Sequence, residues 1–114
     1  MDKKKRLRNK ADRLWYRKHL KDHCEICGRE ANQVHHFFPK SGYNNIRHDD
    51  DNAISVCQGC HMAIHFRGDP EPNQIIIKNR GEDWYERLLA KSKQRLKTLG
   101  IKHYEEVIKY LDDQ

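Results

Sequence analysis

Cys24-Glu-Ile-Cys27 and Cys57-Gln-Gly-Cys60 are the two stretches that decide the fold of this chain. Each is a short turn that can present two thiolates to one ion. Four thiolates complete a tetrahedral zinc site, and a closed site of this kind is structural and not catalytic. Two disulfides or redox-active Cys-x-x-Cys motifs are the alternatives. We favour zinc because disulfides are rare in reducing compartments, and because the βαβ context of a thioredoxin-like motif is not visible.

The segment between the two cysteine pairs contains the residues suited to chemistry. It includes Val34-His35-His36-Phe37-Phe38 and Asn52-Ala53-Ile54-Ser55-Val56. Residues 34–38 and 53–56 have the composition of short strands, which could pair as a hairpin across the loop at residues 39–51. Residues 58–66 are then predicted to form a short helix. The expected order is strand, loop, strand, helix.

His61 and His65 follow the second cysteine pair at positions i and i+4. This spacing places both imidazoles on one helix face, so they can bind one metal ion. Cys60 lies next to His61 but projects in a different direction, which leaves room for two separate metal sites. Two alternatives remain, namely that these histidines are only exposed polar residues, or that one zinc takes mixed cysteine and histidine ligands.

Size and charge narrow the class of protein. The chain has 114 residues, of which 36% are hydrophobic and 35% charged, so we expect one small domain with a thin core that needs a staple such as a metal. The net charge of +6 favours a polyanionic partner. Residues 3–21 are strongly basic with Asp12 as their one acidic residue, which favours nucleic-acid contact over a merely solvated helix face. No stretch resembles a membrane span or a signal peptide, so we expect a cytoplasmic protein.

We divide the single expected domain, 1–114, into three parts. Residues 1–22 are predicted to be a basic helical arm, residues 23–70 the zinc-stapled core, and residues 71–114 a C-terminal strand and helices. The three isoleucines within residues 74–78 predict the strand. A helix is predicted from near Glu82 to a stop at Gly100, and a last helix follows. The apolar residues of these two helices are Trp84, Leu88, Leu89, Leu96, Leu99, Tyr104, Val107, Ile108 and Leu111.

Several other side chains have a possible functional role, but we favour a structural or solvent-exposed one. Asp49, Asp50 and Asp51 could reach a metal, but we favour a solvated loop for them and for His48. Trp15 and Trp84 are expected in the core and not as platforms for stacking bases.

The run from Cys24 to His65 resembles the HNH endonuclease family, in the branch with a four-cysteine zinc. It is similar to colicin-type nucleases in having His-His, then Asn, then His-x-x-x-His. The part from Ile75 to Leu89 is similar to bacteriophage recombination nucleases of the HNH class, which suggests a bacterial or phage-encoded protein. The resemblance implies an α+β fold with a small ββα-metal, treble-clef-like core and flanking N- and C-terminal helices.

The resemblance also implies roles for individual residues. His36 corresponds to the general base, and Asn52 to the residue that holds the loop and orients the base. His35, His61 and His65 correspond to ligands of one catalytic divalent ion. We expect Mg²⁺ or Mn²⁺, although imidazole ligands also suit Ni²⁺ or Zn²⁺. The structural Zn²⁺ is expected on Cys24, Cys27, Cys57 and Cys60.

These roles fit the hydrolysis of DNA. A histidine can take a proton from water near neutral pH, and one divalent ion can stabilise the leaving 3′ oxygen. Adjacent strand residues project to opposite sides, so His35 can serve the metal and His36 the water. The expected function is a metal-dependent DNA endonuclease that cuts phosphodiester bonds, including nicking of one strand.

The expected partner is DNA, with no membrane and with protein partners unspecified. Lys40, Arg67 and Arg80 are candidate phosphate contacts, with surface solubility as the alternative role. The competing function is a zinc-dependent DNA-binding module without catalysis. That module would explain the cysteines and the charge, but not the histidines together with Asn52.

Overall fold

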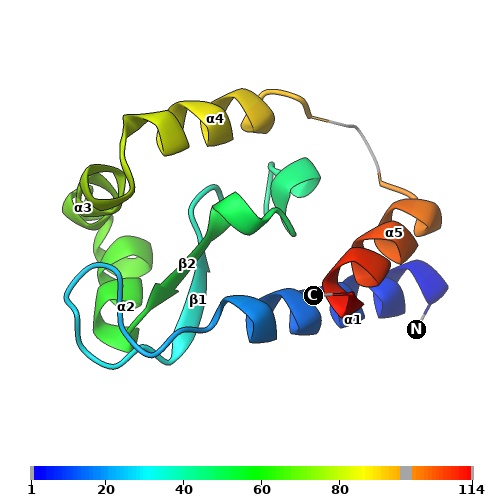
Figure 1. Cartoon of the computed structure of the whole chain (residues 1–114), viewed down its shortest axis with the longest axis horizontal. Helices are drawn as coiled ribbons and strands as arrows, with labels where there is room; N and C mark the ends of the chain where they lie inside the picture. The colour runs from blue at the N-terminus through cyan, green and yellow to red at the C-terminus, as the bar shows by residue number, and fades with distance from the viewer. Residues whose placement is uncertain (1, 96–98, 114) are drawn as a thin grey trace.

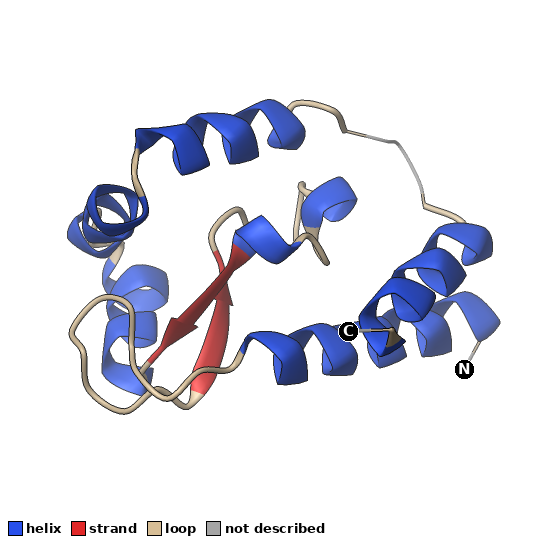
Figure 2. Ribbon diagram, viewed as in Figure 1, coloured by secondary structure: helices blue, strands red, loops and turns tan. Residues whose placement is uncertain are grey.

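The computed structural model describes residues 2–95 and 99–113 and has a two-stranded antiparallel sheet surrounded by helices (Figures 1 and 2). The elements in chain order are α1 (Lys3–His19), β1 (Gln33–His36), η1 (Asn44–Ile46), η2 (Asp50–Asn52), β2 (Ala53–Val56), α2 (Gln58–Arg67), α3 (Glu71–Arg80), α4 (Glu82–Ser92) and α5 (Ile101–Asp112). The α+β class and the order strand, loop, strand, helix are confirmed. None of the helices in the described part of the chain is both long and apolar enough to span a membrane.

The register of the sheet separates the two adjacent histidines of β1. His35 pairs with Ile54 of β2, and His36 pairs with Ala53. Because successive side chains on a strand point to opposite faces, His35 is turned toward α2 and His36 toward α1. The sheet therefore places neighbouring imidazoles in two different environments.

Two groups of buried side chains hold the helices to the sheet. One joins the first cysteine turn and β2 to α3 and α4, and consists of Cys24, Ile46, Ile54, Val56, Ile76, Trp84 and Leu88. The other joins the sheet to α1 and α5, and consists of Trp15, Val34, Ala53 and Leu111. Figure 1 shows α1 and α5 side by side at one end of the molecule. Both tryptophans lie in the core as predicted, and α1 is a packed element and not a free arm.

The prediction of a strand at residues 74–78 is wrong, because this segment lies inside the helix α3. Pro72 sits in the first turn of α3, where its missing N–H costs nothing. The helix buries Ile76 completely and packs Ile77 against the same core. A β-branched composition favours a strand only where a partner strand exists, and the two described strands pair only with each other.

The helix predicted from Glu82 to Gly100 is shorter than expected. α4 ends at Ser92. Leu96, which was expected on the apolar face of this helix, lies outside the described residues. Leu99 is buried, and Gly100 precedes α5 as its N-cap instead of ending α4. The final helix was predicted correctly, and it buries Tyr104, Ile108 and Leu111.

The loop at residues 39–51 is more structured than predicted. η1 and η2 occupy part of it, and Asp49 caps η2 by accepting a hydrogen bond from the backbone N–H of Asp51. His48 was expected in solvent but is buried, with its side chain 3% exposed against Asp12 of α1. Contacts to α1 therefore order a segment that the local sequence marks only as polar.

Candidate active site and zinc site

The four cysteines come together as the sequence predicts. Their sulfur atoms all lie within 4.8 Å of one another, and Cys27 Sγ is 3.6 Å from Cys57 Sγ. Thiolates at about 2.3 Å around a tetrahedral zinc are roughly 3.8 Å apart, so the cluster has the size of a zinc site. None of the cysteines in the described chain forms a disulfide. The geometry favours the zinc interpretation over the disulfide alternative.

The surroundings of the cysteines act differently on Cys24 and Cys60. Burial opposes ionisation of Cys24, but backbone N–H groups outweigh it and lower the pKa of that thiol to about 7. Cys57 caps α2, and its Sγ accepts a hydrogen bond from the backbone N–H of Cys60. Burial and the neighbouring thiols raise the pKa of Cys60 well above its usual range. Four thiolates at this separation repel one another, so a divalent cation is the group that the cluster fits.

A second candidate metal site lies between β1 and α2. Ring nitrogens of His35, His61 and His65 lie within 4.8 Å of one another, and the Nε2 atoms of His61 and His65 are 2.9 Å apart. His35 is buried, and neither of its ring nitrogens has a hydrogen-bond partner among the described residues. Burying an unpaired imidazole is costly, whereas a metal ion would satisfy it. The three residues therefore fit a metal ion.

The protonation of these histidines also suits metal binding. Burial, together with the nearby imidazoles, lowers the pKa of His35 to about 3, so its ring is neutral at neutral pH. Gln33, two residues earlier on the same face of β1, accepts a hydrogen bond from Nδ1–H of His61. This bond leaves the lone pair on Nε2 of His61, which is the atom that faces His65. His65 is exposed, so one side of the site is open to solvent.

His36 is held in one orientation on the other face of the sheet. Its Nε2–H donates to the carbonyl oxygen of Arg47 at 3.0 Å, because a carbonyl can only accept. The lone pair of the neutral ring is therefore on Nδ1. Burial lowers the pKa of His36 to about 4, partly offset by the Arg47 carbonyl. The ring also stacks on Trp15, with centroids 4.2 Å apart and planes 15° from parallel.

Asn52 fastens the loop that lies between the two strands. It is completely buried, and its Oδ1 accepts from the backbone N–H of Phe38 at 2.8 Å. Its Nδ2 donates to the carbonyls of Phe38 at 3.0 Å and Ile46 at 3.3 Å. The amide thus ties the start of the loop to the segment that precedes Arg47. The side-chain hydrogen bonds of Asn52 go to Phe38 and Ile46 and not to His36 or the three clustered histidines, so Asn52 can influence His36 only through the loop.

One groove of about 490 Å³ is lined by His36 and by the candidate metal ligands. It is lined by both faces of this end of the sheet and by α1, and its wall includes His35, His36, His61, His65 and Lys40. An anionic group that enters the groove can approach His36 and the three clustered histidines at once. The cationic side chain of Lys40 is exposed at this groove, which suits an anionic substrate.

The other two predicted phosphate contacts lie elsewhere. Arg67 is exposed at the end of α2 and does not line the groove. Arg80 forms an ion pair with Glu25 at 2.7 Å and donates to the Ala53 carbonyl at 2.8 Å. Because these bonds occupy its guanidinium, Arg80 ties α3 to the first cysteine turn and to β2. This arrangement favours a structural role for Arg80.

Sequence reasoning missed some residues that shape the site. Gln33 fixes the tautomer of His61, while Asp12 and Trp15 of α1 contact Arg47 and His36, respectively. The only signal for Asp12 was its position as the lone acidic residue in a basic run. Neither Gln33 nor Trp15 carried a local signal, because their partners are distant in the sequence.

Comparisons with known proteins agree with the geometry. Residues 24–67 match the family model described as HNH endonuclease. The curated "Mitochondrial DNA mismatch repair protein mutS homolog" of Sarcophyton glaucum is 44% identical over 48 residues, which cover 39% of this chain but only 5% of that protein. No solved structure matches. The match to the HNH endonuclease model, residues 24–67, spans the segment that contains both candidate metal-ligand clusters.

Proposed function

We propose that this chain is a metal-dependent DNA endonuclease that hydrolyses phosphodiester bonds. One observation carries the proposal: buried His35, with unpaired ring nitrogens, converges with His61 and His65 on the groove that also holds His36. A module that only binds DNA needs no such arrangement. The four-cysteine cluster would hold a structural zinc.

The groove supplies the groups that phosphodiester hydrolysis requires. Nδ1 of His36 takes a proton from a water molecule, whose oxygen forms a bond to phosphorus while the bond to the 3′ oxygen breaks. A divalent ion held by His35, His61 and His65 would polarise the phosphate and stabilise the leaving oxygen. Gln33 orients His61 for this task through its Nδ1–H. Mg²⁺ or Mn²⁺ is the expected ion, and the imidazole ligands also suit Ni²⁺ or Zn²⁺.

Cationic side chains near the groove would bind the DNA backbone. Lys40 lines the groove, and Arg13 and Arg17 are exposed on α1 beside Tyr16, which is also part of the groove wall. Arg67 at the end of α2 would extend this contact. Arg80 is left out because its guanidinium is held by Glu25. Contacts of this kind are independent of sequence and supply most of the affinity.

The test uses supercoiled plasmid with Mg²⁺ or Mn²⁺, with and without EDTA. We expect metal-dependent nicked or linear products, and we expect His36→Ala to abolish them while zinc content stays unchanged. His23→Ala replaces an exposed histidine outside the groove and is the matched control. His65→Ala should also lose cleavage but retain zinc and DNA binding. If wild-type protein binds DNA without cutting it, the non-catalytic module is the better interpretation.

A further inference from the structure

We propose that α1 is part of the catalytic unit and that Asp12 and Trp15 are positioning residues for His36. That His36 acts as the base rests on the proposed function. The contacts of Asp12 and Trp15 with Arg47 and His36 are independent of it. The two residues act on His36 by different routes. Asp12 holds the segment that offers the Arg47 carbonyl, and Trp15 holds the imidazole ring itself.

The first route runs through the side chain of Arg47. Its Nε and Nη2 donate to the two carboxylate oxygens of Asp12 at 2.9 and 2.6 Å. The same carboxylate bonds to Nε2 of His48 at 2.7 Å. A two-point contact between guanidinium and carboxylate fixes direction as well as distance. Asp12 therefore restrains two consecutive loop residues, and the carbonyl of the first one accepts from His36.

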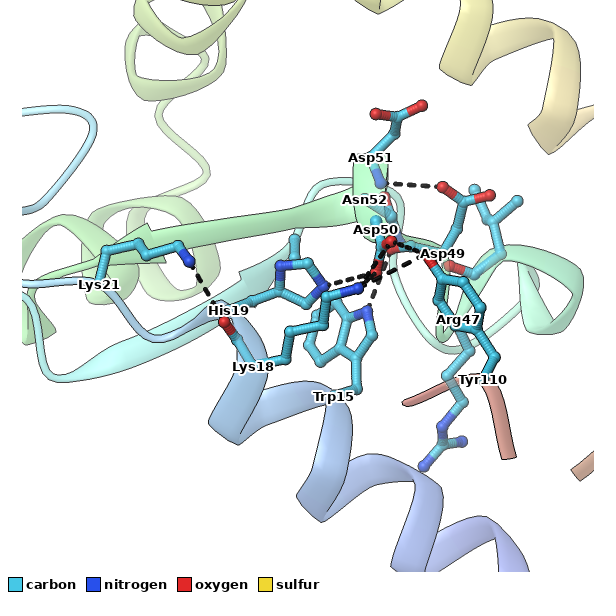
Figure 3. Close-up of polar contacts among 12 residues, drawn as sticks. Trp15, Lys18, His19, Lys21, Arg47, Asp49, Asp50, Asp51, Asn52 and Tyr110 are labelled. Atoms are coloured by element: carbon cyan, nitrogen blue, oxygen red, sulfur yellow. Dashed lines mark hydrogen bonds and ion pairs between the residues drawn. The ribbon is translucent and has the colours of Figure 1, made fainter. Parts of the chain in front are cut away.

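The second route runs through Trp15. Its ring lies flat against His36 on one side, and its Nε1–H donates to the Asp49 carbonyl at 3.1 Å. Figure 3 shows Trp15, Lys18 and His19 projecting from α1 toward the segment that contains Asp49 and Asp50. Together with Asp12, these residues attach α1 to positions 47–50 in turn.

These contacts constrain the direction in which Nδ1 of His36 points. An imidazole held only at Nε2 can still tilt about that bond, and stacking on an indole opposes the tilt. The helix is itself buttressed, since Leu111 of α5 packs with Trp15 and the ring of Tyr104 contacts His48. A misplacement of about 1 Å at a reacting group can cost on the order of 100-fold in rate. α1 therefore does more than present basic side chains to DNA.

The direct test is ¹⁵N NMR of the histidine rings in the full chain. In the wild-type protein we expect a protected Nε2–H signal from His36, assigned by its loss in His36→Ala. Asp12→Ala should broaden or remove that signal while the zinc content and the near-ultraviolet circular dichroism stay unchanged. Asp12→Asn keeps the shape of the side chain and serves if Asp12→Ala does not fold. An unchanged His36 signal in the folded variant overturns the proposal.

Steady-state kinetics give the second readout. Asp12→Asn should lower kcat about 10- to 100-fold and change KM less than twofold, because the base is misaligned while phosphate contacts remain. Asp83→Asn, an exposed carboxylate at the start of α4, is the control and should keep wild-type kcat. Wild-type kcat in Asp12→Asn refutes the positioning role alone. A wild-type chain that never cuts refutes the proposed function, and the NMR result still decides whether α1 positions His36.

Discussion

Replacing Asn52 by Ala should destabilise the fold more than any other single change of an amide in the described chain. The side chain is completely buried and bonds to the backbone N–H and carbonyl of Phe38 and to the carbonyl of Ile46. Alanine removes every one of these bonds and offers no replacement.

The expected loss in the free energy of unfolding follows from those hydrogen bonds. An unpaired N–H at Phe38 costs about 1–3 kcal/mol, and each carbonyl that loses its donor costs about 1 kcal/mol or less. We expect the free energy of unfolding to fall by about 3 kcal/mol, a large part of the 5–15 kcal/mol typical of a domain. At roughly 4 °C per kcal/mol, Tm should fall by about 12 °C. Cleavage should fall as well, since the loop that offers the Arg47 carbonyl loses its fastening.

Urea denaturation, followed by the fluorescence of buried Trp15 and Trp84, measures the change. Asn32→Ala is the matched control, because Asn32 is exposed and should change stability by less than about 0.5 kcal/mol. Asn52→Asp should be at least as destabilising, since a carboxylate would face the Phe38 and Ile46 carbonyls. If the free energy of unfolding of Asn52→Ala lies within about 0.5 kcal/mol of the wild-type value, the amide does not hold the loop and the prediction is refuted.

Three further outcomes test other parts of the site. Cys57→Ser should release the zinc and unfold the core, because the free energy of metal binding contributes directly to folding in small zinc domains. Metal analysis and circular dichroism would detect both changes. A folded protein without zinc would contradict this prediction. Gln33→Ala should lower the affinity for the proposed catalytic ion about 10- to 100-fold, measured by calorimetry, while the structural zinc is retained. An unchanged affinity would show that Gln33 does not orient His61. Burial opposes ionisation of Asp12, but hydrogen bonds from His48 and Arg47 outweigh it and hold its pKa well below the usual range. The wild type should therefore be more stable than Asp12→Asn above about pH 4 and lose this advantage as the pH falls further, which acid denaturation of both proteins would show.

The sequence alone predicted the features that depend on local spacing. Two Cys-x-x-Cys pairs predicted one four-sulfur cluster, and the i, i+4 spacing of His61 and His65 placed both rings on one face of α2. The alternation of a strand predicted that His35 and His36 would face different environments. The helix face and the strand alternation follow from short-range geometry, which a few consecutive residues determine. The meeting of the two cysteine pairs was predicted instead from the preference of structural zinc for four ligands.

Local patterns failed where partners come from elsewhere in the chain. The isoleucines of residues 75–77 favoured a strand, but the core buries Ile76 from a helix. Polar residues near His48 suggested a solvated loop, but Asp12 of α1 binds His48 and orders the segment. Intrinsic preferences are worth less than 1 kcal/mol per residue, so burial and ion pairs formed by the whole fold outweigh them.

The sequence by itself therefore determined which residues could form the two candidate metal-ligand clusters, because their residue types and the short spacing within each Cys-x-x-Cys and His-x-x-x-His pair mark them. Only the tertiary structure decided how His36 is held. Asp12 and Arg47 are 35 residues apart, and Trp15 lies 34 residues from the carbonyl to which it donates. Contacts over such separations form only when packing brings α1 against the sheet and α5 against α1. No periodicity in the chain encodes them, since they depend on the docking of whole elements and not on the conformation of any one.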